Sequence, residues 1–325
     1  MCILVTGAGG FIGSHLCERL VSEGNTVRAF LRYNSVNSRG WLSSSSYQKD
    51  IEFFAGDIRD YDSVIKAMKG IQRVYHLAAL ISIPYSYQVQ RAFIDVNVGG
   101  TLNILQAALD TSVERVVHTS TSEVYGTAQY VPMDEKHPIN PQSPYAATKS
   151  GADFLAVSFF KTFHLPVVVI RPFNVFGPRQ SARAIIPTII TQFLSDRKHI
   201  SLGSLTPTRD FTFVKDTVSG FVCAGTSDSS EIMGKVFNIG SNIEMSVESL
   251  VNLISEITGI KKQVVTEDER IRPVLSEVER LNADNTQAKT VLGFTPHFSF
   301  REGLAETIEW FMGNMHLYHS ELYNV

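Results

Sequence analysis

A tyrosine and a lysine stand at positions i and i+4 of the segment Tyr-Ala-Ala-Thr-Lys, as Tyr145 and Lys149. On a helix this spacing places the two side chains one above the other on the same face. A phenol with a pKa of about 10 is a poor base at neutral pH, but an ammonium group about 4–6 Å away favours the phenolate. Such a tyrosine can take the proton of a hydroxyl group while hydride leaves the same carbon. Because Tyr-x-x-x-Lys is also common as a surface pair, its meaning depends on the segments around it.

A cluster of small polar residues lies upstream, where an apolar stretch ending at His118 runs into Thr-Ser-Thr-Ser-Glu. Thr121 can donate or accept a hydrogen bond at a reacting oxygen, and the carboxylate of Glu123 can transfer a proton. Taken singly, these side chains would be a turn hydroxyl and a solvent-facing acid. Together with the Tyr145–Lys149 pair they predict an active site.

A glycine-rich turn, Thr-Gly-Ala-Gly-Gly-Phe-Ile-Gly at residues 6–13, follows an apolar run and opens a helical pattern. Glycines let the backbone approach a pyrophosphate, and the helix N-terminus offers it unpaired N–H groups. The spacing Gly-x-x-Gly-x-x-Gly departs from Gly-x-Gly-x-x-Gly, so a tight turn without a ligand is the alternative. The context favours a dinucleotide-binding turn. Its expected cofactor contacts are Gly7, Gly10, Phe11, Ile12 and Gly13.

The choice between NAD and NADP is expected about 20 residues further on, where a carboxylate would bind the adenosine 2′-hydroxyl. No acid stands in residues 27–34, but Arg32 falls just past the expected position. A guanidinium there can pair with a 2′-phosphate, so we expect NADP in preference to NAD; a solvated loop cation is the alternative. Asp57, with Ile58 beside it, is a candidate partner for the adenine amino group, or else a helix cap.

The scaffold that must position these residues is visible in the first 175 residues, which alternate short β-branched runs with longer helical patterns. This alternation is typical of βαβ units on a parallel sheet. Right-handed crossovers give an α/β, doubly wound (Rossmann) sheet whose ligands lie beyond the carboxyl ends of the strands. The expected strands are 3–6, 26–31, 51–54, 73–77, 115–119 and 167–171. The expected helices include 11–22, 60–68, 97–110 and 146–163.

The regular βαβ pattern ends at about residue 171. Beyond it, prolines interrupt the chain and helical segments alternate with short loops. We expect residues 1–175 to form a dinucleotide-binding domain and residues 176–325 to form mainly a smaller α/β lobe for the substrate. A later strand at 236–239, within the segment 236–241, is expected to return to the sheet, so the boundary is not a single cut.

Composition excludes several classes of protein. The formal net charge is −3, so no global excess of basic residues indicates a nucleic acid or a membrane surface as partner. Charged residues make up 19% of the chain, below the roughly 25% of an average soluble domain, which favours a large core. Three cysteines without Cys-x-x-Cys spacing favour neither a disulfide framework nor a metal site. With no signal-like or membrane-spanning run, we expect a cytoplasmic protein.

Taken together, the motifs resemble those of the extended short-chain dehydrogenases/reductases that act on nucleotide sugars, over nearly the whole chain. The matching segments are 6–13, 76–79, 97–101, 121–126, 145–149 and 171–178. The resemblance implies a nicotinamide cofactor and a sugar-nucleotide substrate. It also implies a homodimer joined through a helix bundle that includes the helix of Tyr145. The further cofactor contacts that it implies are Leu77, Ala78, Ala79, Tyr145 and Lys149.

The Thr-Ser-Glu sequence at 121–123 narrows the reaction. C4-epimerases of this family usually carry small residues where Glu123 stands, and the deoxythymidine-linked 4,6-dehydratases have Asp in place of Ser122. GDP-mannose 4,6-dehydratases have Thr-Ser-Glu, but UDP-glucuronate decarboxylases share it. The sequences around Arg32 and Arg209 most resemble those of the GDP-N-acetylglucosamine 4,6-dehydratases of legionaminic acid synthesis. We therefore expect 4,6-dehydration of a GDP-N-acetylglucosamine or GDP-mannose type of hexose, with UDP-glucuronate decarboxylation and then 4-epimerisation as alternatives.

The resemblance also implies a set of substrate contacts, in which arginines hold the diphosphate bidentately. For each arginine the alternative is a surface ion pair. The expected contacts are Ser122, Asn174, Arg209, Arg272 and Glu277. His76 and His118 end apolar runs, and we expect them to be packed core imidazoles rather than catalysts.

Overall fold

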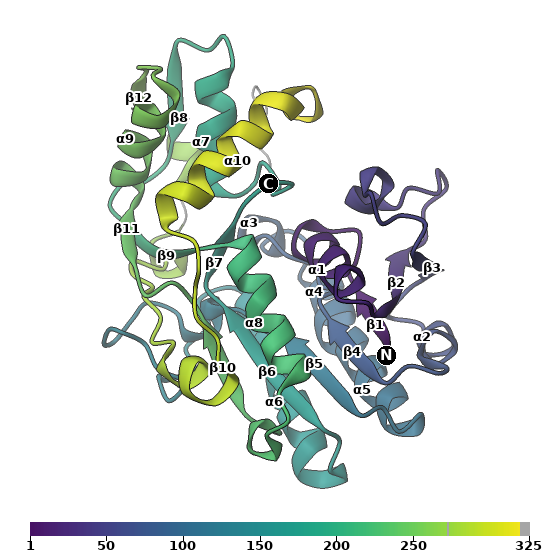
Figure 1. Cartoon of the computed structure of the whole chain (residues 1–325). Coiled ribbons are helices and arrows are strands. Elements are labelled where there is room, and N and C mark those ends of the chain that lie inside the picture. Colours follow the sequence, from purple (N-terminus) through teal and green to yellow (C-terminus); the bar gives the residue numbers. More distant parts are fainter. Residues whose placement is uncertain (272, 319–325) are drawn as a thin grey trace.

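The computed structural model describes residues 1–271 and 273–318, and at its centre lies a parallel sheet with the strand order β10-β6-β5-β4-β1-β2-β3 (Figure 1). Its strands are β1 (Cys2–Thr6), β2 (Thr26–Arg32), β3 (Ile51–Gly56), β4 (Arg73–His76), β5 (Arg115–Thr119), β6 (Val167–Pro172) and β10 (Val236–Ile239). The chain order reverses between β1 and β4, which pair with each other. This arrangement confirms the predicted doubly wound α/β fold.

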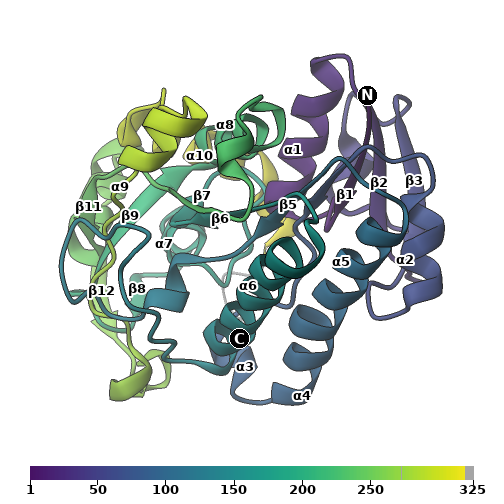
Figure 2. The same cartoon turned by 90° about the horizontal axis from the view of Figure 1, so that it is seen from below.

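Helices cover both faces of the sheet, as Figure 2 shows. On one face lie α1 (Phe11–Ser22) and α8 (Val214–Thr226), and on the other lie α2 (Tyr61–Met68), α5 (Gly100–Asp110) and α6 (Pro144–Phe163). Side chains alternate along each strand, so Ile3 and Val5 pack in the core beneath α1 whereas Leu4 packs in the core beneath α5. Burial on both faces explains why these strands read as continuous apolar runs.

The starts of helices α2 and α5 differ from the prediction for local reasons. Helix α2 begins at Tyr61 because Asp60 is its N-cap, accepting a hydrogen bond from the Asp62 N–H. Asp57 is therefore not the cap of this helix. The helix expected at 97–110 is preceded by short helices α3 (Ile83–Ser86) and α4 (Gln90–Phe93) and by the π-helical turn η2 (Ile94–Gly99), which runs directly into α5.

Elements of the C-terminal part gather at one end of the sheet, toward the upper left of Figure 1. A small sheet has the order β11-β9-β7, and β8 pairs with β12 in parallel. Strand β10 pairs with β6, which confirms the predicted return to the main sheet. The alternation of helices and loops predicted here missed the five strands that the described residues form outside the main sheet. They are β7 (Asn174–Phe176), β8 (His199–Leu202), β9 (Thr208–Phe213), β11 (Glu244–Ser246) and β12 (Gln263–Thr266), and the helices are α7 (Ile185–Leu194), α9 (Val247–Thr258) and α10 (Phe300–Asn314).

Two kinds of feature are absent from the described residues. No helix within 1–271 and 273–318 has the length and apolar character needed to cross a membrane. The same residues contain no group of three or more His, Cys, Asp or Glu side chains placed to hold a metal ion.

Candidate active site

The predicted site residues come together where the carboxyl ends of β1, β4 and β5 meet. Leu77, directly after β4, donates its N–H to the Thr6 carbonyl oxygen at 3.2 Å, and the Ala78 N–H donates to the Thr6 hydroxyl at 3.1 Å. Strand β5 ends at Thr119 and leads into the 3-10 turn η3 (Ser122–Tyr125). The glycine turn, residues 77–79 and the Thr-Ser-Glu segment thus share one edge of the sheet, as parallel strands require.

The glycine turn is shaped for close approach. Gly7 has φ +69°, and a Cβ there would lie 2.8 Å from the Ala78 nitrogen; a Cβ at Gly13 would lie 2.2 Å from the Gly7 oxygen. The N–H of Gly10 donates to that same oxygen at 3.0 Å. Helix α1 then begins at Phe11 with no side chain capping its N-terminus. A backbone cradle at an uncapped helix start suits the diphosphate of a dinucleotide, so these residues fit such a cofactor.

The residues predicted at the adenosine end also lie near one another. Arg32 is exposed at the end of β2, and its charge contributes to lowering the pKa of Asp57, although the main cause is the hydrogen bond from Arg59. The Asp57–Arg59 ion pair is 2.6 Å long, between Oδ2 and Nη2. Ile58 is buried against α5, where a Cβ on Gly100 would lie 2.5 Å from its Cδ1. The Asp57 carboxylate therefore has a charged partner from its own loop.

A second arginine near this end was missed by the sequence analysis. The Arg39 guanidinium lies 4.1 Å above the centre of the Phe53 ring. Its segment packs on the glycine turn, because a Cβ on Gly9 would lie 2.8 Å from the Arg39 carbonyl oxygen and the Trp41 N–H donates to the Gly9 oxygen at 3.0 Å. No motif spacing marks Arg39, so only the fold could reveal it.

The Tyr145–Lys149 pair occupies the start of α6. Ser143 caps this helix by accepting a hydrogen bond from the Ala146 N–H at 3.1 Å, and Pro144 fills its first turn. Tyr145 contacts the Thr121 side chain, and Lys149 donates from Nζ to the Thr119 carbonyl oxygen at 2.5 Å. The structure therefore brings the three predicted side chains of Thr121, Tyr145 and Lys149 to the end of β5.

The electrostatics of the pair differ from the expectation. Burial raises the pKa of Tyr145; the contact with Thr121 opposes this rise, and the nearby charge of Glu123 adds to it. Burial lowers the pKa of Lys149 to about 8, and Asp153 opposes that shift. In this structure burial is the main influence on the pKa of Tyr145, and help from Lys149 in forming the phenolate stays a prediction.

The turn η3 is fixed by buried hydrogen bonds at its C-terminal end. Glu123 is half-buried within it, and Ser122 is buried at its start. Tyr125, at its end, donates its hydroxyl proton to Asn238 Oδ1 at 2.8 Å and accepts a hydrogen bond from Arg171 Nη1 at 3.0 Å. The position of the Glu123 backbone is therefore fixed by buried contacts with two strands of the main sheet.

The predicted substrate contacts are distributed over the small sheet and its surroundings. Asn174 begins β7, and its buried Oδ1 has no hydrogen-bond partner among residues 1–271 and 273–318, as a ligand contact would require. Arg209, on β9, is buried, and its Nη2 lies 3.1 Å from Glu277 Oε1. The structure thus places two of the predicted residues, Arg209 and Glu277, in one ion pair. Arg272 lies outside the described residues.

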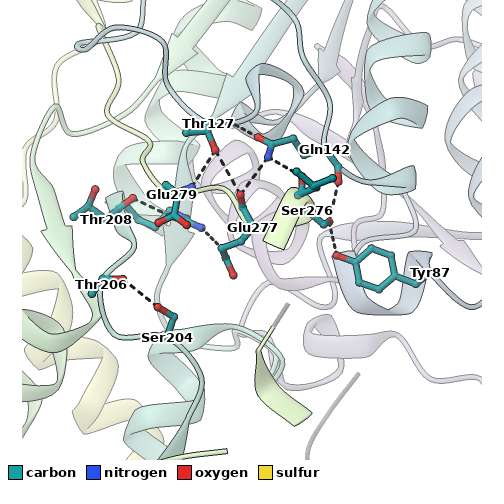
Figure 3. A network of polar contacts seen from close by, with 11 residues as sticks. Tyr87, Thr127, Gln142, Ser204, Thr206, Thr208, Ser276, Glu277 and Glu279 are labelled. Carbon is teal, nitrogen blue, oxygen red and sulfur yellow. Dashed lines mark hydrogen bonds and ion pairs between the residues drawn. The ribbon is translucent and has the colours of Figure 1, made fainter. Parts of the chain in front are cut away.

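Residues 273–279 form a segment that we call the strap. It contacts residues before 176, such as Gln142, and residues after 176, such as Thr208 (Figure 3). Gln142 donates from Nε2 to the carbonyl oxygens of Leu275 at 2.9 Å and Glu277 at 3.2 Å. Ser276 donates its hydroxyl to the Gln142 carbonyl oxygen at 2.8 Å and shares a hydrogen bond of 2.6 Å with the Tyr87 hydroxyl. No sequence signal singled out Gln142 or Tyr87, because their role depends on contacts more than 130 residues away in the chain.

The strap is also bound on its other side. The Thr208 N–H on β9 donates to the Glu279 carbonyl oxygen at 3.0 Å, and the Glu279 N–H donates to the Thr127 hydroxyl at 3.1 Å. Figure 3 shows these contacts surrounding Glu277. The backbone of the strap is thereby held on both sides of Glu277, which positions the Glu277 carboxylate beside Arg209.

Comparison with known proteins gives consistent results over nearly the full length. A family model described as GDP-mannose 4,6 dehydratase matches residues 4–307. A UDP-glucose 4-epimerase of Mycolicibacterium smegmatis is 35% identical over 316 residues, covering 96% of this chain and 98% of the relative. A dTDP-D-glucose 4,6-dehydratase of Homo sapiens is 32% identical over 329 residues, covering 97% of this chain and 91% of the relative.

A solved structure extends the similarity to three dimensions. The dTDP-glucose 4,6-dehydratase from Streptomyces venezuelae, crystallised with NAD bound, has a TM-score of 0.88 to this chain at 29% sequence identity, covering 98% of this chain and 99% of its own. The described fold and the full-length matches lead to one conclusion. The chain belongs to the GDP-mannose 4,6 dehydratase family, the nucleotide-sugar 4,6-dehydratases and epimerases among the extended short-chain dehydrogenases/reductases.

Proposed function

We propose that the protein catalyses the 4,6-dehydration of a nucleotide-activated hexose, of the GDP-N-acetylglucosamine or GDP-mannose type, to a 4-keto-6-deoxy sugar nucleotide. The observation that carries the proposal is the position of Glu123, close enough to Tyr145 for its charge to raise the pKa of the phenol. An acid beside the oxidising tyrosine allows chemistry at a neighbouring carbon, which simple oxidation and return at C4 does not need.

In the proposed reaction Tyr145, helped by Lys149 and with Thr121 hydrogen-bonded at the same oxygen, takes the proton of the C4 hydroxyl. A nicotinamide cofactor in the cradle of the glycine turn supplies the hydride acceptor, and later the donor, when bound. The C4 ketone acidifies the C5 proton, because the carbanion is delocalised as an enolate. Glu123 removes that proton and then delivers it to the departing C6 hydroxyl, which leaves as water. C6 of the resulting enone takes back the hydride that left C4, C5 takes a proton from solvent, and Tyr145 releases its proton to solvent, which completes the 4-keto-6-deoxy sugar.

The product formed in deuterated water tests the proposal. With a panel of GDP- and UDP-sugars, we expect a 4-keto-6-deoxy product that carries deuterium at C5, detected by mass spectrometry and NMR. Glu123→Gln should stop the loss of water while some oxidation at C4 continues. Release of carbon dioxide, or dehydration that Glu123→Gln leaves unchanged, would contradict the proposed role of Glu123.

A UDP-sugar 4-epimerase is the second candidate, because the epimerase relative at 35% identity exceeds the dehydratase relative at 32%. Its product would keep the C6 hydroxyl and incorporate no deuterium at C5. The acid at Glu123 argues against it. The same product panel therefore separates the two candidates.

For the cofactor we propose NADP in preference to NAD, on the basis of exposed Arg32 at the end of β2. The related Streptomyces venezuelae structure contains NAD, so the preference needs a direct test. We expect the ratio of the dissociation constants for NAD and NADP, measured by calorimetry, to favour NADP at least tenfold, the effect of about 1.4 kcal/mol. Arg32→Ala should bring the ratio close to one, and an unchanged ratio would remove Arg32 from this role.

For the substrate diphosphate we propose Arg209 and Arg272, with Glu277, Ser122 and Asn174 as further contacts. Arg209 is buried beside Glu277, and the free Asn174 oxygen lies on the neighbouring strand β7. In this scheme residues 176–325 mainly serve the sugar nucleotide and residues 1–175 mainly serve the cofactor. Arg209→Lys, which keeps the charge and loses the bidentate fork, should raise KM more than it lowers kcat.

We also propose a homodimer built on α6 and its neighbours. Phe154 on α6 is 60% exposed, and Leu102 on α5 and Ile94 on η2 are 42% and 48% exposed on elements that pack against it. A second copy of the chain would cover these side chains. Light scattering should give the mass of a dimer that Phe154→Glu converts to a monomer, whereas Met312→Glu, at an exposed site on α10, should leave the dimer intact. A monomeric wild-type protein would contradict the proposal.

A further inference from the structure

The middle of helix α6 holds a carboxylate that has no part in the proposed reaction. Asp153 stands one helical turn after Lys149 and is 1% exposed. Its Oδ2 accepts hydrogen bonds from the Ser120 hydroxyl at 2.6 Å and from Nε and Nη2 of Arg171 at 3.1 and 3.0 Å. Its Oδ1 lies 3.3 Å from Nε2 of His118. An isolated buried carboxylate would be costly, so this constellation of donors is a built environment for a negative charge.

The surrounding groups keep Asp153 ionised. Burial acts to raise the pKa of its carboxyl, but the contact with His118 and the charge of Arg171 outweigh burial and hold the pKa below its usual range. Burial also lowers the pKa of His118, so the imidazole stays neutral. Asp153 is therefore a fixed anion across the neutral pH range.

Lys149 is the cation that most needs such an anion, because it is only 3% exposed. Within the described residues, the charge of Asp153 favours the ammonium form of Lys149 and so opposes the effect of burial. His76 on β4 and His118 on β5 also lie near Lys149: burial is the main cause of their lowered pKa, and the charge of Lys149 adds to it. Arg171 on β6 carries a like charge. From η3, Glu123 faces the neighbouring Tyr145.

Asp153 also reaches the catalytic segment through a direct hydrogen bond. Ser120, which donates to Asp153, directly precedes Thr121 in the chain. Arg171, held by the same carboxylate, donates to the Tyr125 hydroxyl at the end of η3. One buried side chain thus connects the helix that carries Tyr145 and Lys149 with the strand end that carries Thr121 and with the turn that carries Glu123.

We propose that Asp153 is a positioning residue of the active site, a buried anion that faces the ammonium group of Lys149 and anchors Ser120 beside Thr121. The proposal rests on the catalytic roles given to Tyr145 and Lys149. It makes no assumption about whether dehydration or epimerisation follows.

Direct titration of Lys149 tests the electrostatic part without any turnover. Lysine labelled with ¹³C at Cε is incorporated into the full chain, which is then saturated with NAD, and the Lys149 signal is assigned by its loss in Lys149→Met. In Asp153→Asn the titration midpoint of Lys149 should fall by about 1 pH unit or more, the effect typical of removing an opposite charge 4–6 Å away. An unchanged or higher midpoint would overturn the proposal.

A matched control separates this effect from a general loss of buried structure. Asp216 on α8 is 2% exposed and accepts hydrogen bonds from the backbone N–H groups of His297 and Phe298 at 2.8 and 3.3 Å. Asp216→Asn should lower the melting temperature without moving the Lys149 midpoint. If Asp153→Asn does not fold, Ser120→Ala replaces it: loss of the hydrogen bond to Asp153 beside Thr121 should lower kcat at constant KM, and an unchanged kcat would overturn the proposal.

Turnover gives the second readout. In Asp153→Asn kcat should fall and its alkaline limb should move to lower pH with the Lys149 midpoint, because the neutral lysine forms earlier. KM for the sugar nucleotide should stay constant, since Arg209 and Glu277 are untouched. If no sugar nucleotide of the panel is dehydrated, the proposed function is contradicted. The change in the titration midpoint of Lys149, measured by NMR, would still decide the role of Asp153.

Discussion

Lys149 ties helix α6 to the end of strand β5, because its Nζ donates a hydrogen bond to the carbonyl oxygen of Thr119 at 2.5 Å. The contact fixes the helix that carries Tyr145 against the strand that leads to Thr121. The pKa of Tyr145 is nevertheless raised, mainly by burial. To act as a base, Tyr145 therefore needs groups that lower the pKa of its phenol when cofactor and substrate are bound; the contact with Thr121 already acts in that direction.

Removal of the Tyr145 hydroxyl should abolish most of the activity. In Tyr145→Phe the ring keeps its edge-on packing against Phe93, whose centroid is 6.3 Å away. We expect kcat to fall by roughly 10²–10⁴-fold, the usual contribution of general acid–base catalysis, with an unchanged melting temperature. Tyr61→Phe, which removes a hydroxyl bound to Asp110 on the helical surface, is the control. Near-normal turnover in Tyr145→Phe would show that another group takes the proton.

Space at the glycine turn should be essential for cofactor retention. Gly7→Ala combines a φ of +69° with a Cβ 2.8 Å from the Ala78 nitrogen, whereas Gly24, with φ +81°, has open space around its Cβ position. Both alanine variants carry backbone strain, but only Gly7→Ala also carries the clash. We expect Gly7→Ala to lose nicotinamide binding, measured by calorimetry, and Gly24→Ala to bind normally with a lower melting temperature. Equal binding by both variants would contradict this account of the turn.

Acid should destabilise the fold through His15, whose side chain is half-buried on α1. Burial lowers the pKa of His15 to about 4, and Arg179 adds to the shift. In the unfolded chain the imidazole takes up its proton near pH 6.5, so stability is fully present above about that pH and is lost as pH falls toward 4. The melting temperature should drop between pH 7 and pH 5, and His15→Asn should flatten that dependence. A steeper fall in His15→Asn would reverse the assigned sign.

The strap should control substrate affinity rather than chemistry. Gln142→Ala removes two hydrogen bonds to the strap, at Leu275 and Glu277, and so loosens the carboxylate that faces Arg209. We expect KM for the sugar nucleotide to rise about tenfold, with kcat changed less than threefold, because loss of binding equal in ground and transition states affects KM alone. Gln106→Ala, on the outer face of α5, is the control. A fall in kcat at constant KM would place Gln142 in the chemistry instead.

Much of the fold was predictable because buried parallel strands leave a strong signal. Strand Arg115–Thr119 and helix Phe11–Ser22 have the predicted bounds, as does the returning strand Val236–Ile239. The short strands β8 and β12, which pair with each other across about 60 residues, were missed because neither carries the continuous apolar run of a strand buried on both faces. Such pairing depends on tertiary contacts that local periodicity does not record.

The residues of the candidate site also fall into those that the sequence revealed and those that it did not. Thr121, Tyr145 and Lys149 were found from sequence because their types and spacing reflect the chemistry itself. Gln142 and Asp153 were not, because a buried polar side chain gains its meaning from partners on other elements. The raised pKa of Tyr145 likewise follows from burial, which a motif does not encode.

The fate of the hydrogen on C4 tests the central claim most directly. A sugar nucleotide of the GDP series labelled with deuterium at C4 is converted in ordinary water, and the product is examined by NMR. The proposed reaction, with oxidation through Tyr145 and elimination through Glu123, predicts a 4-keto product with the deuterium in its C6 methyl group. Deuterium returned to C4 in a 4-epimer that keeps its C6 hydroxyl would contradict it.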